Sequence, residues 1–192
     1  IVGLSSSALA GLTTDKLNII GTQDISALTS LQVVALTSAQ IANLSSGQIS
    51  ALSSAQLNAL STSALIALTP SNIVGLSSSA LAGLTTDKLS IIGTQDISAL
   101  TSAQLAGLTS NQASALSTAQ IAALTSGQVA NLSSGQISGL SSAQLNALST
   151  SALIALTPSN IVGLSSSALA GLTTNKLNIL TTQNIGSLTS AQ

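Results

Sequence analysis

The 192 residues include no His, Cys, Met or aromatic residue, and only 4% of them are charged. The charges are three Lys and four Asp, and a net charge of −1 gives nucleic-acid binding no electrostatic basis. Without His, Cys or Glu the chain has no base near neutral pH and no activated nucleophile, so we expect no catalytic site, no metal site and no cofactor. Apolar residues are 45% of the chain but are dispersed, and no run approaches the ~20 residues that cross a bilayer.

An eight-residue unit repeats along the whole chain. Every eighth residue from Leu4 to Leu188 is Leu, except for Ile at positions 20 and 92. With this Leu as position one, position two is Ser or Thr except at Gly21 and Gly93, and position six is Ile, Leu or Val except at Ala113. Position five favours Gln. We therefore expect residues 1–192 to be one continuous octapeptide-repeat array, and a piece of a longer chain.

The octads are also grouped into longer segments that recur along the chain. Residues 1–30 recur at residues 73–102 with one change, Asn18 to Ser90, and recur more loosely at residues 161–190. The offsets of 72 and 88 residues are whole numbers of octads, so the array grows or shrinks by complete units. Length and register therefore matter more than any single position.

A long helix and a plain strand both fit the octad poorly. At ~100° per residue an octad leaves a drift of about 80°, so the apolar stripe of a long helix would wind around it. In a strand, aliphatic residues spaced five and three apart would point to opposite faces. A β-solenoid with a corner in each octad remains the alternative.

Each octad has the sequence pattern that is typical of the beginning of a helix. Position two predicts an N-cap, and Gln at position five completes a capping box. Positions one and six would then form a hydrophobic staple. Pro70 and Pro158 each follow a Thr, at the first helical position, where Pro is favoured. The predicted capping residues are Thr37, Gln40, Ser45, Gln48, Ser53, Gln56, Thr69 and Pro70, and the predicted structural core is Leu36, Ile41, Leu44, Ile49, Leu52, Leu57, Leu76 and Leu84.

These observations predict an all-α solenoid, a superhelix of very short helices of about six residues, one per octad. Ordering eight residues costs ~12 kcal/mol, whereas burying two large aliphatic side chains returns roughly 3–6 kcal/mol. Stacking on neighbouring octads must therefore stabilise each unit. Small residues at position eight, such as Gly11 and Gly75, would let neighbouring segments approach closely.

The few charged residues allow two interpretations. Lys16 and Asp24 share one octad position a repeat apart, as do Lys88 and Asp96. One interpretation is a cation site or a Lys–Asp crosslink, and the other is an exposed charge ladder worth under about 1 kcal/mol. In the third copy, which keeps Lys176, Asn residues replace both acids (Asn175 for Asp15 and Asp87, Asn184 for Asp24 and Asp96), so we favour the exposed ladder.

The run from Leu36 to Ile49 resembles the octad arrays of very long, repetitive bacterial surface and secreted proteins, and the resemblance covers the whole chain. It implies an extracellular or cell-surface structural array. Low charge and identical units also favour self-association into a filament, sheath or stalk. An ice- or surface-binding module and a passive spacer of a large adhesin are the alternatives. Self is the expected partner, with no nucleic acid and no membrane span, and the Asn43 and Asn131 sequons are candidate glycan sites.

Overall fold

The computed structural model describes residues 3–192, and within this range it contains 23 short α-helices and no strand. Each helix lies in one octad and has four to six residues. The all-α solenoid that the sequence predicts is confirmed, and the β-solenoid alternative is wrong for the described residues. The helices are α1 (Ser6–Ala10), α2 (Thr14–Asn18), α3 (Thr22–Ser26), α4 (Ser30–Val34), α5 (Ser38–Asn43), α6 (Ser46–Ser50), α7 (Ser54–Ala59), α8 (Thr62–Ile66), α9 (Pro70–Ile73), α10 (Ser78–Ala82), α11 (Thr86–Ser90), α12 (Thr94–Ala99), α13 (Ser102–Ala106), α14 (Ser110–Ala115), α15 (Thr118–Ala122), α16 (Ser126–Ala130), α17 (Ser134–Ser138), α18 (Ser142–Ala147), α19 (Thr150–Ile154), α20 (Pro158–Ile161), α21 (Ser166–Ala170), α22 (Thr174–Asn178) and α23 (Thr182–Gly186).

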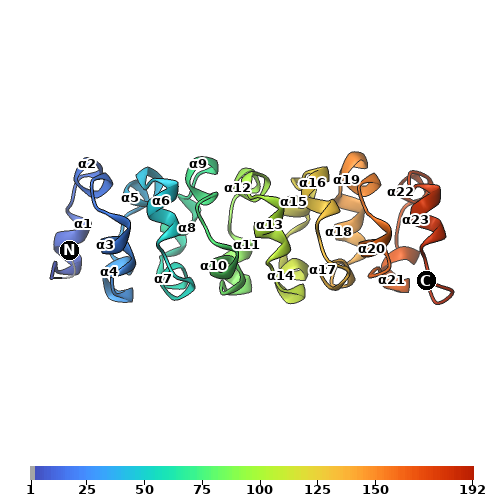
Figure 1. Cartoon of the computed structure of the whole chain (residues 1–192), viewed down its shortest axis with the longest axis horizontal. Coiled ribbons are helices and arrows are strands. Elements are labelled where there is room, and N and C mark those ends of the chain that lie inside the picture. Colours follow the sequence, from blue (N-terminus) through green and yellow to red (C-terminus); the bar gives the residue numbers. More distant parts are fainter. Residues whose placement is uncertain (1–2) are drawn as a thin grey trace. The chain divides into compact units, whose positions relative to one another are not determined.

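The chain divides into two compact units, Ile1–Leu100 and Thr101–Gln192. In both units a helix packs on the third helix after it (Figure 1). Examples are α4 on α7 and α5 on α8 in the first unit, and α15 on α18 and α16 on α19 in the second. Each unit is therefore a coil in which successive turns lie against each other.

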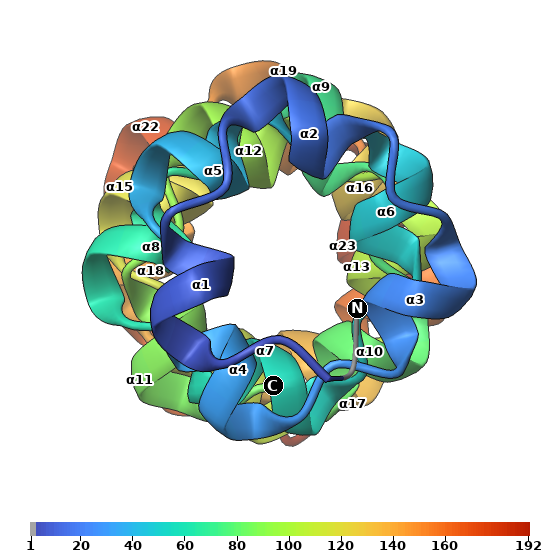
Figure 2. The same ribbon diagram turned by 90° about the vertical axis from the view of Figure 1, so that its left-hand side faces the viewer.

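Figure 2 shows the path of the first unit from its N-terminal side. Helices α1, α2, α3 and α4 follow one another clockwise as the chain recedes from the viewer, so this path is right-handed. Helix α5 then packs on α2. Side-chain hydrogen bonds between adjacent turns join residues that are 25 to 31 positions apart. One turn therefore takes about three and a half octads.

The bend between α5 and α6 comes from two extended residues in succession. Leu44, which follows α5, has φ −62° and ψ 137°, and Ser45, the N-cap of α6, has φ −67° and ψ 158°. The hydroxyl of Ser45 then accepts a hydrogen bond from the backbone N–H of Gln48 and starts the next helix. A Ser or Thr every eight residues thus keeps every helix short.

The core consists of positions one and six of the octad, which face the adjoining turns. The side chains at these positions pack between helices, as the staple pattern requires. All eight predicted core residues are buried, with 4% of their surface or less exposed: Leu36, Ile41, Leu44, Ile49, Leu52, Leu57, Leu76 and Leu84.

Close approach between turns at position eight depends on the octad. A Cβ added to Gly75 would lie 1.9 Å from the backbone oxygen of Ser46 in the preceding turn, so only glycine fits there. A Cβ on Gly11 would meet only backbone oxygens of its own helix, the nearest at 3.4 Å. The expectation of close approach is therefore confirmed at Gly75, and at Gly11, where the given sequence has no residue 29 positions earlier, it stays a prediction.

Candidate functional site

The glutamine at position five closes the start of its own helix. In α5, α6 and α7 the N-cap hydroxyl accepts from the N–H of the Gln, and the Gln side chain accepts from the N–H of the N-cap residue. Between Ser45 and Gln48 the two distances are 3.2 Å and 3.0 Å. The residues that form these three capping boxes are Thr37, Gln40, Ser45, Gln48, Ser53 and Gln56.

The same glutamines also bind the preceding superhelical turn. The Nε2 of Gln48 donates to the carbonyl oxygens of Leu17 at 3.0 Å and Ile20 at 2.9 Å, at the end of α2. Gln40 in the first unit and Gln136 in the second make the equivalent bonds. The last carbonyls of a helix lack partners within that helix. One Gln side chain therefore caps the start of its own helix and the end of another helix one turn earlier.

This second contact accounts for the use of Gln at position five and for the absence of Glu from the chain. Glu is equally common in capping boxes, because its carboxylate also accepts from the N-cap N–H. A carboxylate has no hydrogen to donate to the carbonyls of the preceding turn. The preference for the amide is the sequence signal of the inter-turn contact, although spacing within one octad indicates only the cap.

Asparagine takes the place of glutamine in α9. The Oδ1 of Asn72 accepts from the backbone N–H of Thr69 at 2.9 Å, and its Nδ2 donates to the carbonyl oxygen of Ile41 at 3.0 Å. Pro70 is the first residue of this helix and Thr69 is its N-cap, as the octad places them. The shorter side chain suffices because this octad also contains Gly75, where the two turns approach most closely.

The lysine octads use two side chains for the same task. The Nζ of Lys88 donates to the carbonyl oxygen of Leu60, 28 residues earlier. The Oδ1 of Asn58, from the preceding turn, accepts from the N–H of Thr85 at 3.0 Å and so replaces the capping oxygen. Lys16 and Asp24 are exposed, as the expectation of an exposed charge ladder has it, but the expectation is wrong for Lys88, which faces the preceding turn.

Asp96 occupies position five of α12 and is also buried, with 6% of its surface exposed. Its carboxylate accepts a hydrogen bond from the backbone of Gly93, the N-cap of α12. Its Oδ1 is buried and has no hydrogen-bond partner among the described residues. In the register of the Gln octads, this oxygen stands where a donor would meet the carbonyls of Leu65 and Leu68. Burial raises the pKa of the Asp96 carboxyl, and the bond from Gly93 opposes the shift.

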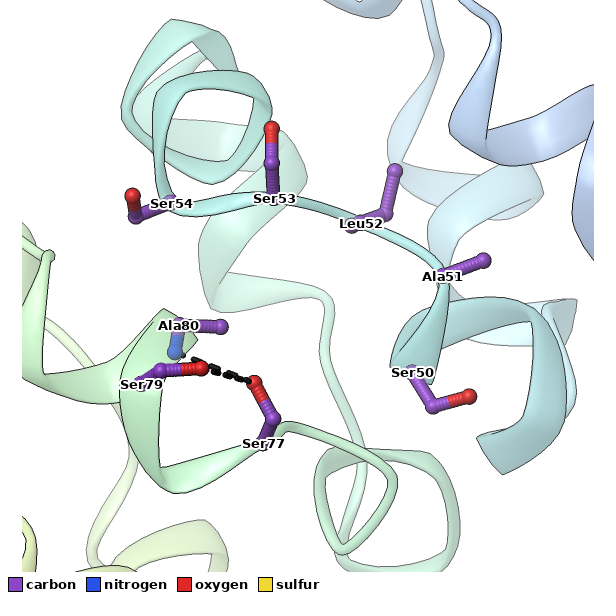
Figure 3. A pocket seen from close by; sticks show the side chains of 8 residues that line it. All are labelled: Ser50, Ala51, Leu52, Ser53, Ser54, Ser77, Ser79 and Ala80. Atoms are coloured by element: carbon purple, nitrogen blue, oxygen red, sulfur yellow. Dashed lines mark hydrogen bonds between the residues drawn. The ribbon is translucent and has the colours of Figure 1, made fainter.

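At Ala80 and Ala168, where position five is alanine, the space that the Gln side chain occupies in other octads is empty, and we call this space the seat. At Ala80 the gap is a notch of about 350 Å³ between α10 and the preceding turn. In Figure 3 the Cβ of Ala80 points into this notch, and Leu52, Ser53 and Ser54 lie across from it. The second unit has an equivalent notch of about 270 Å³ at Ala168.

A serine at position four accompanies each of these alanines. The Oγ atoms of Ser77 and Ser79 form a hydrogen bond of 3.0 Å, and the Oγ of Ser77 also accepts from the N–H of Ala80 at 3.0 Å. The N-cap hydroxyl of a Gln octad bonds to the Gln Oε1 instead, as Ser53 does. Ser79 therefore replaces only the contact of the N-cap hydroxyl with the Gln Oε1, and among the described residues of the octad nothing replaces the acceptor of the N-cap N–H or the donor to the preceding turn.

The described residues contain no group of three or more His, Cys, Asp or Glu side chains that could hold a metal ion. None of the helices in this part of the chain is long and apolar enough to cross a membrane.

The sequence model of the ALTTAQ repeat matches the chain four times, at residues 17–54, 35–70, 89–126 and 122–158. Together these matches cover residues 17–70 and 89–158, which is more than half of the chain. A comparison with curated proteins finds no match. The first two matches contain all of the predicted capping residues from Thr37 to Pro70. The chain belongs to the ALTTAQ repeat family, and it is a repeat protein built as a helical solenoid.

Proposed function

We propose that the chain is a structural array that forms or extends an extracellular filament, sheath or stalk by self-association, and that it has no catalytic role. The observation that carries this proposal is the contact between turns that the Gln octads repeat. Gln40, Gln48 and Gln56 each donate to carbonyls 28 and 31 residues earlier, with the same pair of octad positions as acceptors. A contact that recurs from one Gln octad to the next extends a coil by whole units, which is how repeat arrays gain length.

The exposed surface supports self-association. Large aliphatic side chains lie in solvent, with exposed fractions of 78% at Leu31, 51% at Val34 and 52% at Ile66 in the first unit. Ile154 and Val162 are 42% and 41% exposed in the second. Three Lys and four Asp provide little electrostatic repulsion between copies. Exposed aliphatic groups with few charges favour association.

A location outside the cell or on its surface is supported by the resemblance of the octads to bacterial surface arrays. Both sequon asparagines, Asn43 and Asn131, are exposed. The Nδ2 of each donates at 2.8 Å to a carbonyl oxygen four residues earlier, so a glycan there would replace a local bond within the helix.

An ice- or surface-binding role receives less support. Such a face needs rows of free hydroxyl groups, whereas the position-two hydroxyls accept hydrogen bonds from their own helices, as Ser45 and Ser53 do. We therefore retain the passive spacer of an adhesin as the main competitor of the filament.

Sedimentation velocity over a range of concentrations distinguishes a self-associating filament from a passive spacer, and electron microscopy of the same samples identifies filaments. We expect association that increases with concentration. A single monomeric species at every concentration would contradict self-association and favour the spacer.

Two deletions serve as matched variants in that experiment. Deletion of residues 44–51, one complete octad, should preserve helical circular dichroism and association, because the next octad offers the same acceptors. Deletion of residues 44–47 should abolish both, because it separates the staple from the cap. Antibody labelling of intact cells tests the location independently.

A further inference from the structure

We propose that the notches at Ala80 and Ala168 are binding sites for a primary carboxamide group supplied from outside the chain. The argument comes from the neighbouring octads, in which the same seat holds the carboxamide of a glutamine. Removal of that side chain at position five leaves the surrounding hydrogen-bonding groups in place.

Two acceptors lie at the notch of Ala80. In the octad of Gln56, Nε2 donates to the carbonyl oxygens of Ser26 at 3.2 Å and Leu28 at 2.7 Å, which lie 30 and 28 residues earlier. The same offsets from Ala80 lead to the carbonyls of Ser50 and Leu52. Among the residues that the structure describes, no hydrogen bond reaches these two oxygens. They are acceptors without a donor.

One donor completes the seat. The N–H of Ser53 donates to the Oε1 of Gln56 at 2.8 Å. The equivalent group in α10 is the N–H of Ser77, and within the described part of the chain it has no hydrogen-bond partner. The notch thus offers two acceptors and one donor, and a primary carboxamide offers two N–H donors and one carbonyl oxygen. The two sets are complementary.

The lysine octads show which of these hydrogen bonds a different ligand, a primary ammonium group, could make. The Nζ of Lys88 reaches the carbonyl of Leu60 but supplies no acceptor for the N–H of its own N-cap, which bonds to Asn58 instead. A primary ammonium would therefore leave the N–H of Ser77 unpaired. An amide without N–H groups would leave both carbonyls unpaired, so we expect primary amides to bind best, ammonium less well and tertiary amides not at all.

Ligand-observed saturation-transfer NMR with propionamide tests the site in the whole 192-residue chain. We expect transfer that saturates with propionamide concentration, and no such transfer to N,N-dimethylpropionamide. The double variant Ala80→Gln, Ala168→Gln fills both seats and should lose the effect. The matched control, Ala55→Gln with Ala143→Gln, adds two glutamines at exposed position-four sites and should retain it. Equal transfer in the filled and control variants, or from both amides, would overturn the proposal.

The source of the natural carboxamide is either a Gln or Asn side chain of a second copy or a free small amide. Sedimentation of the same variants distinguishes them. Weaker association of the filled variant than of the control assigns the group to a second copy, and unchanged association together with saturable propionamide binding assigns it to a free amide. A monomeric wild type would refute the proposed filament, while the NMR result would still decide the carboxamide site.

Discussion

The substitution Gln48→Glu separates the two roles of position five, because Glu keeps the capping oxygen and loses the donor to the preceding turn. The Nε2 of Gln48 makes two short bonds, to Leu17 at 3.0 Å and Ile20 at 2.9 Å. At about 0.5–1.5 kcal/mol for each neutral bond, their loss costs about 1–3 kcal/mol. The side chain is 3% exposed, so the introduced carboxylate also lies uncompensated among carbonyl oxygens. A buried, unpaired charge brings the total to about 3–5 kcal/mol.

The comparison with Gln48→Ala makes this a test of the reasoning. Truncation loses the same two bonds and the capping bond, but it admits water and releases about 1.5–2 kcal/mol of side-chain entropy. The net cost should be about 1–3 kcal/mol. We therefore expect the order Gln, then Ala, then Glu in the free energy of unfolding at neutral pH. If position five acted only as a cap, the Glu variant would be about as stable as the wild type and the Ala variant would be the least stable.

The assay is urea unfolding followed by far-UV circular dichroism, as a function of pH. Burial should raise the pKa of the introduced carboxyl above its value in the unfolded chain, so its protonated form is favoured in the fold. The penalty is then absent below the unfolded pKa and develops as pH rises through the folded pKa. A Gln48→Glu variant as stable as the wild type at neutral pH would refute the inter-turn role.

Three further substitutions follow from the same geometry, all measured by the same unfolding assay. Asp96→Asn should raise the free energy of unfolding by about 1–3 kcal/mol at neutral pH and have little effect below pH 3.8. The pKa of Asp96 is raised in the fold, so the wild type loses stability as pH rises from the unfolded to the folded pKa. A gain that is independent of pH would contradict this. Ala80→Gln should stabilise the chain by about 1 kcal/mol by filling the notch, whereas Ala55→Gln at an exposed position should be neutral. Gly75→Ala places a Cβ 1.9 Å from a backbone oxygen of the preceding turn and should cost about 1–3 kcal/mol. Gly47→Ala, with nothing closer than 3.8 Å, should instead gain about 0.5–1 kcal/mol, so equal effects of the two glycine substitutions would count against the close approach.

Helix starts and buried positions were predictable from the sequence because they depend on residues within one octad. Thr37 and Gln40 are three residues apart, and Leu36 and Ile41 are five apart, so their roles follow from local spacing alone. The partner of the Gln40 Nε2 could not be predicted in this way, because every octad carries the same carbonyls and the period does not state how many octads make one turn.

The exposure of Lys88 and Asp96 was predicted wrongly for a related reason. Lys and Asp usually lie in solvent, so Lys88 and Asp96 were expected to be exposed. From Gln32 onward, however, position five faces the preceding turn, and the contact with that turn determines where these side chains go. The pairing of Ser79 with Ala80 was visible in the sequence, but it had no interpretation until the reach of the glutamine was known.

The bonds between turns also have a direction. The glutamine amides at position five of the later turn donate to backbone carbonyls of the earlier turn, as Gln48 does to Leu17 and Ile20. For these contacts each turn therefore has two unlike faces, one with the glutamine amides and one with the helix-end carbonyls that accept from them. A turn added in reverse would set amide against amide or carbonyl against carbonyl, so coils of this kind can continue one another only head to tail.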